Sequence, residues 1–217
     1  MTIHRFKQYS KEWWDAHQGR PSASNFGKII TPAKADFSKS AVEYCYELIA
    51  ELYDPNYGMV EDYVTAAMRN GTVMEPESRR FYEMERDCDV EQVGLCESDC
   101  GRFICSPDSL VGDDGVLELK NPAYKTQIKY LIQNKLPDEH KVQCYGHLLV
   151  TKRNWCDFLS YCPRLPPLLV RIEPDEFTLK LAEALEQFWK LYTELRTKIE
   201  GGGDPVACSR EPYIPRF

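Results

Sequence analysis

Three charged residues near the middle of the chain have the types and spacing that hold a metal ion. Asp108 precedes a turn-rich stretch at 112–115, and Glu118 and Lys120 follow that stretch in the run VLELK. Side chains alternate between the two faces of a β-strand, so Glu118 and Lys120 are predicted to point to the same face. Two carboxylates suit Mg²⁺, and a neighbouring ammonium can hold a water or stabilise charge on a phosphate. This set favours metal-dependent hydrolysis of a phosphodiester.

The same three residues also have a simpler explanation. A hairpin can carry a surface ion pair between Glu118 and a nearby lysine, which contributes about 0–1 kcal/mol and has no further role. Short motifs of this kind often match by chance. The three residues alone therefore leave both interpretations open.

The elements that must position these residues follow from apolar periodicity and turn signals. Helices are predicted at 11–18, 40–53, 61–86, 125–133, 140–150 and 175–200. The helix at 40–53 carries Val42, Tyr46, Ile49 and Leu52 at helical spacing, and Pro76 should kink or split the helix at 61–86. Strands are predicted at 90–96, 103–106, 116–120, 156–161 and 168–172, the second and third forming a hairpin. This order predicts an α/β domain with an α+β type of mixed sheet.

The length of 217 residues fits one domain, predicted at 1–200. The segment 201–217 opens with a glycine run and carries three prolines, so an extended C-terminal arm is predicted there. No run is apolar enough to cross a membrane, and no signal peptide is recognisable, so we expect a cytoplasmic protein. The nine cysteines are expected to be reduced thiols.

The net charge of −7 argues against a general nucleic-acid coat protein, which would be basic overall. DNA binding is compatible with this charge only if positive residues are concentrated in a groove or channel. A bound Mg²⁺ would add local positive charge where the phosphate lies.

Pro107-Asp108 and Glu118-Leu119-Lys120 resemble the motif of the PD-(D/E)xK nucleases. More narrowly, residues 10–165 resemble the phage lambda exonuclease and YqaJ-type viral recombinase family. That resemblance rests on EWWDAHQGRPSAS at 12–24, GTVMEP at 71–76 followed by Tyr82, Ser106 two residues before Asp108, and Gln143 in HKVQCYGHLL.

The resemblance implies a restriction-endonuclease-like core with flanking helices, and it assigns catalytic roles. Asp108, Glu118 and the backbone carbonyl of Leu119 would hold Mg²⁺, with Mn²⁺ as a substitute and Glu75 assisting. Lys120, helped by Gln143, would orient or deprotonate the attacking water.

A second group of residues is assigned to the 5′-phosphate of DNA. Where the family pattern has its first arginine, this chain has His17, and Arg20 follows three residues later. We predict that Arg20 binds the phosphate with the nearby hydroxyls, because a guanidinium beside hydroxyl donors suits a dianion. Arg20 could equally be a solvated surface charge. The predicted phosphate-binding set is Arg20, Ser22, Ser24, Ser106 and His17.

The function implied by the resemblance is 5′ to 3′ degradation of duplex DNA from phosphorylated ends, which leaves a 3′ single strand for recombination. Relatives form a homotrimeric ring and act with a single-strand annealing protein in the cytoplasm of a phage-infected or bacterial cell. One alternative is another PD-(D/E)xK nuclease, either an endonuclease or a Cas4-like repair nuclease, although the late C-x₂-C run of cluster enzymes is missing. A DNA-binding module that has lost the chemistry is the other alternative. No role is assigned to His140 or His147.

Overall fold

The chain builds two β-sheets, of which the larger carries the charged residues described above. In the computed structural model, residues 1–54, 57 and 66–201 are described, without the side chains of 66–72. The five-stranded sheet has the order β2 (Val90–Glu91), β5 (Ser109–Val111), β6 (Gly115–Lys120), β7 (Trp155–Ser160) and β8 (Leu168–Ile172). Only β6 and β7 are parallel within this sheet. The three-stranded antiparallel sheet has the order β1 (Thr2–His4), β3 (Leu95–Glu97) and β4 (Ile104–Cys105).

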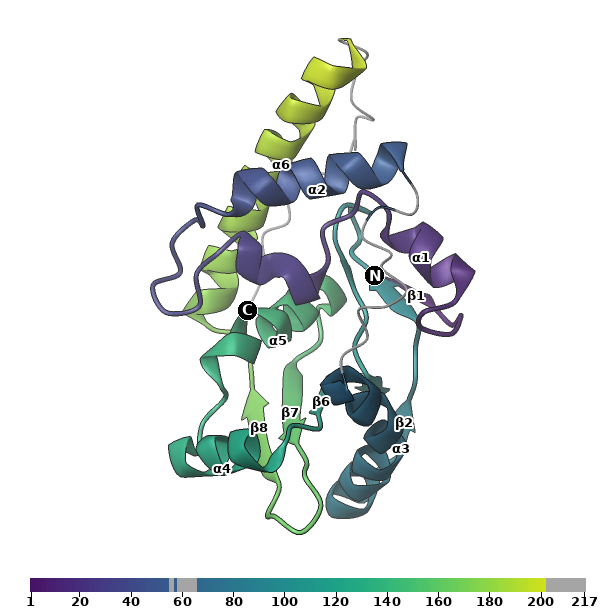
Figure 1. The fold of residues 1–217 in the computed structure, drawn as a ribbon, viewed down its shortest axis with the longest axis vertical. Helices are drawn as coiled ribbons and strands as arrows, with labels where there is room; N and C mark the ends of the chain where they lie inside the picture. The colour runs from purple at the N-terminus through teal and green to yellow at the C-terminus, as the bar shows by residue number, and fades with distance from the viewer. Residues whose placement is uncertain (55–56, 58–65, 202–217) are drawn as a thin grey trace.

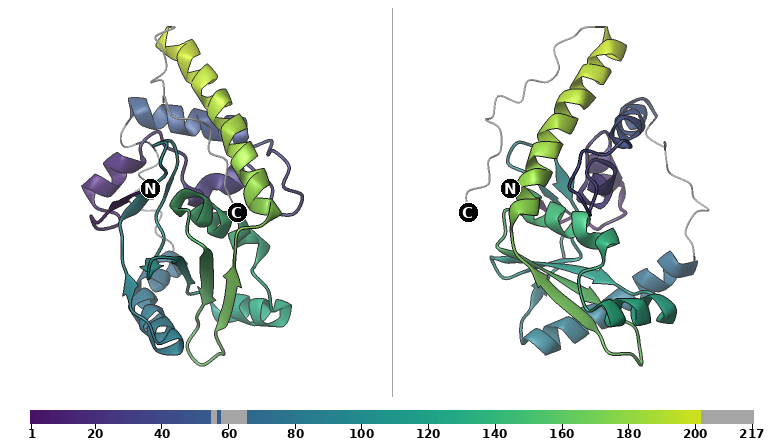
Figure 2. Two further views of the ribbon diagram at one scale, coloured as in Figure 1. Left: turned by 180° about the vertical axis from the view of Figure 1, so that it is seen from behind. Right: turned by 90° about the vertical axis from the view of Figure 1, so that its left-hand side faces the viewer.

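Helices surround the two sheets, and one of them is central (Figure 1). This central helix, α5, packs against the 3-10 helix η1, the long helix α6 and strand β7. Figure 2 shows α6 projecting beyond the sheets at one end, while α3 and α4 lie at the other end. The bounds are α1 (Lys11–His17), η1 (Ala23–Lys28), α2 (Ala41–Tyr53), α3 (Ala66–Arg86), α4 (Tyr124–Gln133), α5 (Asp138–Thr151) and α6 (Glu176–Glu200).

Strand β6 is covered on both faces, as expected for a strand in the middle of a sheet between helical layers. Leu117 and Leu119 pack with the fully buried Tyr82 of α3. Val116 belongs to the larger core on the other face, and alternation places Glu118 on that face too. Glu118 is therefore a carboxylate inside the protein, with only 1% of its surface exposed.

Close packing of α5 against η1 depends on Gly146. A Cβ atom at this position would lie 2.8 Å from the Phe26 ring and 2.9 Å from the Ala23 side chain. Because Gly146 has no side chain, η1 can approach α5 closely. This brings Ser22 and Ser24, at the start of η1, to the same pocket as Glu118 of β6.

The β5–β6 hairpin is held at its turn by a buried arginine. Arg153 Nη1 donates to the carbonyl oxygens of Val111, Gly112 and Gly115 at 3.3, 2.7 and 2.8 Å. One guanidinium thus satisfies three backbone acceptors, and it fixes the hairpin whose strands carry the acid pair.

Most of the predicted elements are present with small shifts in their ends, but the predicted hairpin has a different first strand. Strand β6 pairs with β5 (Ser109–Val111), which was not predicted, while β4 (Ile104–Cys105) belongs to the other sheet. The predicted strand at 90–96 is also wrong, because it is divided between the two sheets at Gly94. A Cβ atom there would lie 2.1 Å from the Phe6 carbonyl oxygen, so the chain needs glycine to cross at this point.

Two features of the predicted helices also differ from the structure. In α2 the buried side chains are Ala41, Tyr44, Cys45, Leu48 and Ile49, so of the predicted stripe only Ile49 is buried. Helix α3 continues through Pro76 and is not split there. Residues 61–65 of the predicted helix at 61–86, and 202–217 of the predicted arm, lie outside the described residues. No helix in the described part combines the length and the apolar character that crossing a bilayer requires.

Replacing Arg153 with methionine is expected to lower the free energy of unfolding by about 2–4 kcal/mol, because buried carbonyl oxygens lose their donor. Urea denaturation monitored by circular dichroism measures this change. Lys198→Ala, which removes an exposed i,i+4 ion pair with Glu194, is the control and should cost about 0.5 kcal/mol or less. Equal effects of the two substitutions would show that Arg153 does not hold the hairpin.

Candidate active site

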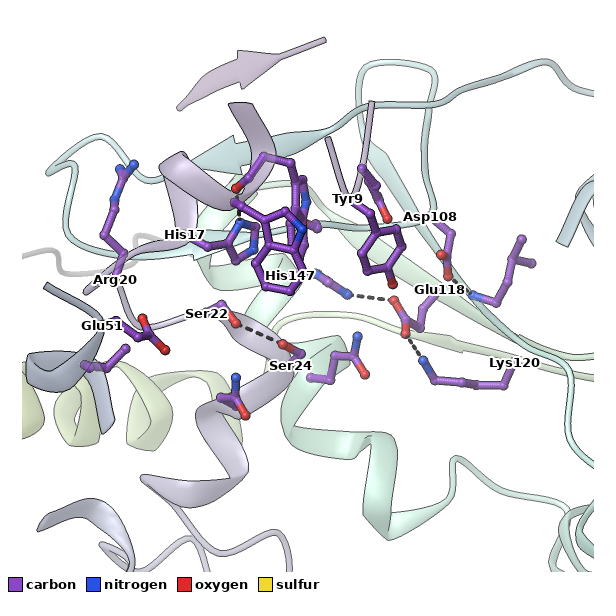
Figure 3. Close-up of a pocket in the computed structure, with 18 of the residues that line it drawn as sticks. Tyr9, His17, Arg20, Ser22, Ser24, Glu51, Asp108, Glu118, Lys120 and His147 are labelled. Carbon is purple, nitrogen blue, oxygen red and sulfur yellow. Dashed lines mark hydrogen bonds and ion pairs between the residues drawn. The ribbon is translucent and has the colours of Figure 1, made fainter. Parts of the chain in front are cut away.

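A pocket of about 390 Å³ opens beside β6 and brings together residues that are far apart in the sequence. Strand β6 provides its floor, α5 one wall, and the segment from Gln8 to Asn25 another (Figure 3). Every residue of the predicted site lines this pocket, namely His17, Arg20, Ser22, Ser24, Glu75, Ser106, Asp108, Glu118, Leu119, Lys120 and Gln143.

Glu118 is held by a donor at each of its two oxygens. Lys120 Nζ lies 2.5 Å from Oε1, and His147 Nε2 lies 2.8 Å from Oε2. Lys120 comes from the same face of the same strand, as predicted from the alternation of side chains. His147 comes from α5, and the packing of this helix over β6 brings it within reach.

Asp108 stands beside Glu118 at the start of the hairpin. Its Oδ2 accepts a hydrogen bond of 2.6 Å from the backbone N–H of Leu119, because β5 begins at the next residue and pairs with β6. The carboxylate is thereby fixed against the strand that carries Glu118. The interpretation of Glu118 as part of a surface ion pair is wrong, since Glu118 is buried.

The two carboxyl groups have opposite pKa shifts. Burial and the neighbouring Glu118 carboxylate raise the pKa of Asp108 to about 8. Burial alone would raise the pKa of Glu118 too, but the Lys120 ammonium and the hydrogen bond from His147 hold it at about 2. Burial lowers the pKa of Lys120, yet Glu118 and Asp108 outweigh this and raise it above its usual value. Lys120 is thus a cation here, which suits the orienting of a water better than its deprotonation.

The donor set fits Mg²⁺, although it is small. Mg²⁺ uses one or two carboxylates and keeps several waters, and Asp108, Glu118 and a backbone carbonyl such as that of Leu119 would supply this set. Burial and the Glu118 carboxylate disfavour ionisation of Asp108, as its raised pKa shows, and a divalent cation would offset both effects. Within 1–54, 57 and 66–201, no three His, Cys, Asp or Glu side chains form a metal-binding group. Glu75 is thus placed at the pocket without joining the acid pair.

Glu75 and Gln143 occupy two sides of the same pocket. Glu75 is half-buried, and burial raises its pKa, while Arg79 and Lys120 act in the opposite direction. Gln143 lies on α5 one helical turn before His147, so the two side chains share a face of that helix. The auxiliary roles assigned to Glu75 and Gln143 stay predictions.

Two of the predicted phosphate-binding serines, Ser22 and Ser24, lie at the other end of the pocket from Asp108 (Figure 3), and Ser106 lines the same pocket. Ser22 and Ser24 contact each other through their hydroxyl oxygens at 2.9 Å. Ser106 accepts a hydrogen bond of 3.0 Å from the indole nitrogen of Trp13. A backbone bridge between Ser22 and Ile104 brings these segments together.

Arg20 and His17 do not form a ready cationic clamp. Arg20 Nη2 lies 2.7 Å from Glu97 Oε2, and its other contacts are the carbonyl oxygens of Ala16 and Gly101. Its guanidinium points away from the serine pair in Figure 3. His17 packs on the Trp13 ring at 3.6 Å between centroids, and burial lowers its pKa to about 4, so it is neutral at pH 7.

Among the other residues that line this pocket, His147 and Tyr9 lie beside the acid pair, and the sequence had given neither a role. The signal for His147 was its position four residues after Gln143, which puts both on one face of α5. Tyr9 is 67% exposed, and its backbone has a φ of 64°, which is rare for a residue other than glycine. Its ring lies next to the acid pair (Figure 3), where partial burial around the phenol hydroxyl, together with Glu75 and Asp108, raises its pKa although most of the residue is exposed.

A mixed sheet flanked by helices, with an acid pair and a lysine at a central hairpin, defines a nuclease of the restriction-endonuclease-like fold. The profile of the YqaJ-like viral recombinase domain matches residues 12–154. The chain therefore belongs to the YqaJ-like viral recombinase domain family and is a nuclease of the recombinase type.

Solved structures agree with this assignment. An alkaline exonuclease, LHK-Exo from Laribacter hongkongensis, is 31% identical with a TM-score of 0.72 over 88% of this chain and 99% of its own. LHK-Exo in complex with dAMP gives a TM-score of 0.70 at the same identity and coverage. A phage related exonuclease from Haemophilus somnus 129PT, at 13% identity and a TM-score of 0.63 over 86% and 99% of the two chains, shares the fold. No curated protein matches the chain significantly.

Asp108→Asn is expected to stabilise the metal-free protein at pH 8. The pKa of Asp108 is about 8 in the folded protein and near 3.8 when unfolded, so the folded state binds the extra proton between these values. The wild-type protein therefore loses stability as pH rises through this range, and the amide does not. The gain at pH 8 should be at least about 1.4 kcal/mol, equivalent to one pKa unit, and smaller at pH 5.

Urea unfolding in EDTA at pH 5 and pH 8 measures this difference. Glu118 provides the opposite sign as an internal comparison, because its low pKa gives stability that is lost only as the pH falls from about 4.5 towards 2. A pH dependence that is the same in wild type and Asp108→Asn would contradict the raised pKa of Asp108.

Proposed function

We propose that the protein is a Mg²⁺-dependent 5′ to 3′ exonuclease that degrades duplex DNA from 5′-phosphorylated ends and leaves 3′ single strands for phage-type recombination. The observation that carries this proposal is the pairing of Asp108 and Glu118 beside Lys120 in one pocket that continues to the serine pair. Similarity to an alkaline exonuclease at 31% identity supports the exonuclease activity.

The proposed reaction is in-line hydrolysis of a phosphodiester. Mg²⁺, or Mn²⁺ in its place, would be held by Asp108, Glu118 and the Leu119 carbonyl, and it would supply charge stabilisation for the departing 3′ oxygen. The Lys120 ammonium then orients the attacking water towards the phosphorus, with Gln143 as a second polar contact. The buried position of Glu118 strengthens these charge interactions, because little water screens them.

The serine end of the pocket provides the proposed site for the terminal phosphate. Ser22 and Ser24 offer hydroxyl groups there, Ser106 adds a hydroxyl in the same pocket, and Arg20 would add a charge-assisted bond if its guanidinium left Glu97. Binding of the end at one side of the pocket and hydrolysis at the other would make the enzyme remove residues from the 5′ end.

Assembly and partners extend this proposal. We infer a homotrimer that encloses duplex DNA, a single-strand annealing protein that receives the 3′ strand, and a cytoplasmic site of action. A closed ring would also explain how an acidic protein binds DNA, because only the channel wall needs positive charge.

Linear 5′-phosphorylated duplex should be digested by the wild-type protein in the presence of Mg²⁺, and not in EDTA. Asp108→Ala and Lys120→Ala should each reduce the rate at least about 100-fold, because each removes a group that contacts the metal or the reacting water. Release of nucleotides from end-labelled DNA measures the rate, and circular dichroism checks that both variants fold.

Covalently closed circular DNA is the control substrate for this experiment. Cutting of the circle would favour an endonuclease over the proposed exonuclease. A folded wild-type protein that binds the duplex and digests neither substrate would favour a DNA-binding module without catalytic activity.

Arg20→Ala should reduce the preference for 5′-phosphorylated over 5′-hydroxyl duplex by about tenfold, since one charge-assisted hydrogen bond contributes about 1.5–3 kcal/mol. The two substrates are compared by initial rates at the same Mg²⁺ concentration. Arg5→Ala is the matched control, because Arg5 forms an exposed ion pair with Glu91 and does not line the pocket. An unchanged preference in Arg20→Ala would assign phosphate binding to the serines alone.

A further inference from the structure

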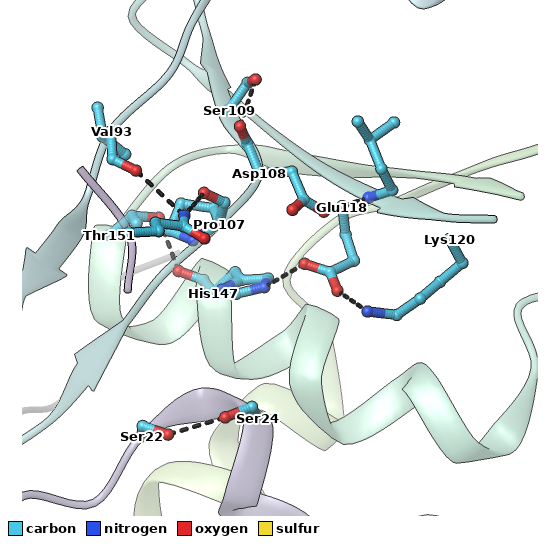
Figure 4. Close-up of polar contacts among 12 residues, drawn as sticks. Ser22, Ser24, Val93, Pro107, Asp108, Ser109, Glu118, Lys120, His147 and Thr151 are labelled. Carbon is cyan, nitrogen blue, oxygen red and sulfur yellow. Dashed lines mark hydrogen bonds and ion pairs between the residues drawn. The ribbon is translucent and has the colours of Figure 1, made fainter. Parts of the chain in front are cut away.

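His147 is a buried polar side chain to which the proposed mechanism gives no role. It has 1% of its surface exposed, and its Nε2 atom lies 2.8 Å from Glu118 Oε2 (Figure 4). Its Nδ1 atom is buried, and the structure gives it no hydrogen-bond partner among the described residues. The contact with Glu118 is thus the polar interaction that the ring makes within the protein.

The chemistry of this contact fixes what the imidazole does. An ionised carboxylate only accepts hydrogen bonds, so the proton lies on Nε2 and His147 is the donor. Such a charge-assisted bond is about twice as strong as a neutral one, and its strength depends on geometry. Glu118 is therefore oriented by a ring whose own position is set by the packing of α5.

The two donors to Glu118 differ in how firmly they are held. The Lys120 side chain is 30% exposed, and its ammonium group is carried on a flexible four-carbon stem. The His147 side chain is 1% exposed and belongs to the central helix α5. Lys120 contacts Oε1, and His147 contacts Oε2. If Lys120 turns towards a water, as the proposed mechanism requires, His147 is the donor that still orients the carboxylate.

We propose that His147 is a positioning residue that holds the Glu118 carboxylate in the orientation in which it binds the divalent cation. This inference rests on the proposed function, because it assigns Glu118 to the metal. Mutation of a residue that hydrogen-bonds to a metal-binding carboxylate typically lowers the metal affinity or the activity by about 10–100-fold. Loss of the donor should therefore weaken cation binding even when no DNA is present.

The test compares His147→Leu, which removes the donor, with His147→Gln, whose amide N–H can still reach Glu118. Binding of Mn²⁺ to the DNA-free protein is measured by isothermal titration calorimetry. We expect the dissociation constant to rise at least about tenfold in His147→Leu and to stay within about threefold of wild type in His147→Gln. The Mg²⁺ concentration for half-maximal nuclease activity should rise by a similar factor in His147→Leu, while the KM for DNA stays unchanged.

His140→Gln is the matched control, because His140 lies on the same helix but contacts Tyr130 and stacks on Phe158. Its Mn²⁺ affinity should equal that of the wild type. The proposal is overturned if folded His147→Leu binds Mn²⁺ within about twofold of wild type, or more tightly.

Should His147→Leu not fold, the comparison of His147→Gln with His147→Asn decides, because the shorter asparagine amide falls short of Glu118. The proposal then predicts at least about tenfold weaker Mn²⁺ binding in the asparagine variant, and equal affinities overturn it. Failure of the proposed function looks different. In that case the wild-type protein itself binds no Mn²⁺ or digests no DNA.

Discussion

The burial of one carboxylate, Glu118, constrains the rest of the structure. A charge taken out of water inside a domain costs several kcal/mol unless donors meet it, and β6 is covered on both faces. The strand supplies one donor two residues on, at Lys120, and the packing of α5 supplies the other, at His147. The parallel pairing of β6 with β7 requires a crossover connection, and α4 and α5 form it. The topology of the sheet therefore brings the second donor to the site.

The same constraint explains why the acid pair is uneven. The Lys120 and His147 side chains both donate to Glu118. Asp108 accepts a hydrogen bond from the backbone N–H of Leu119, and it is buried beside the Glu118 carboxylate. Asp108 therefore keeps its proton at pH 7 in the metal-free protein, and ionisation of both carboxyl groups needs further positive charge at the site. Such an arrangement costs stability in the metal-free protein, and it is the condition under which a divalent cation binds with a net gain.

The sequence allowed the acid pair and the lysine to be identified, because two of the three lie on one strand, where alternation alone decides the face. The pairing of Asp108 with them depended on the hairpin, and its first strand was assigned to the wrong residues since β5 is short and directly follows Asp108. The spacing of His147 from Gln143 placed both on one face of a helix, but it did not show that this face meets β6. The role of His147 depends on which side of α5 meets β6, and nearly every side chain from Val142 to Thr151 is buried, so the sequence does not single out that side. In α2 the small residues Ala41 and Cys45 face inwards and the larger Val42 and Tyr46 outwards, which apolar spacing alone did not distinguish.

The charges at the serine end of the pocket set a condition on how a phosphate could be bound. Of the residues that line the pocket, Arg20 and Lys120 carry a permanent positive charge, and each is already engaged by a carboxylate. His17 is neutral, and Glu51, whose carboxylate accepts from the Gly19 N–H, lies on the same side of the pocket as the serines. A phosphate dianion bound there would contact the serine hydroxyl groups. It could form an ion pair with Arg20 only if it displaced the Glu97 carboxylate from that guanidinium. Binding of a DNA end would therefore be coupled to the contacts between Arg20 and the β3–β4 hairpin, at some distance from the bond that is cut.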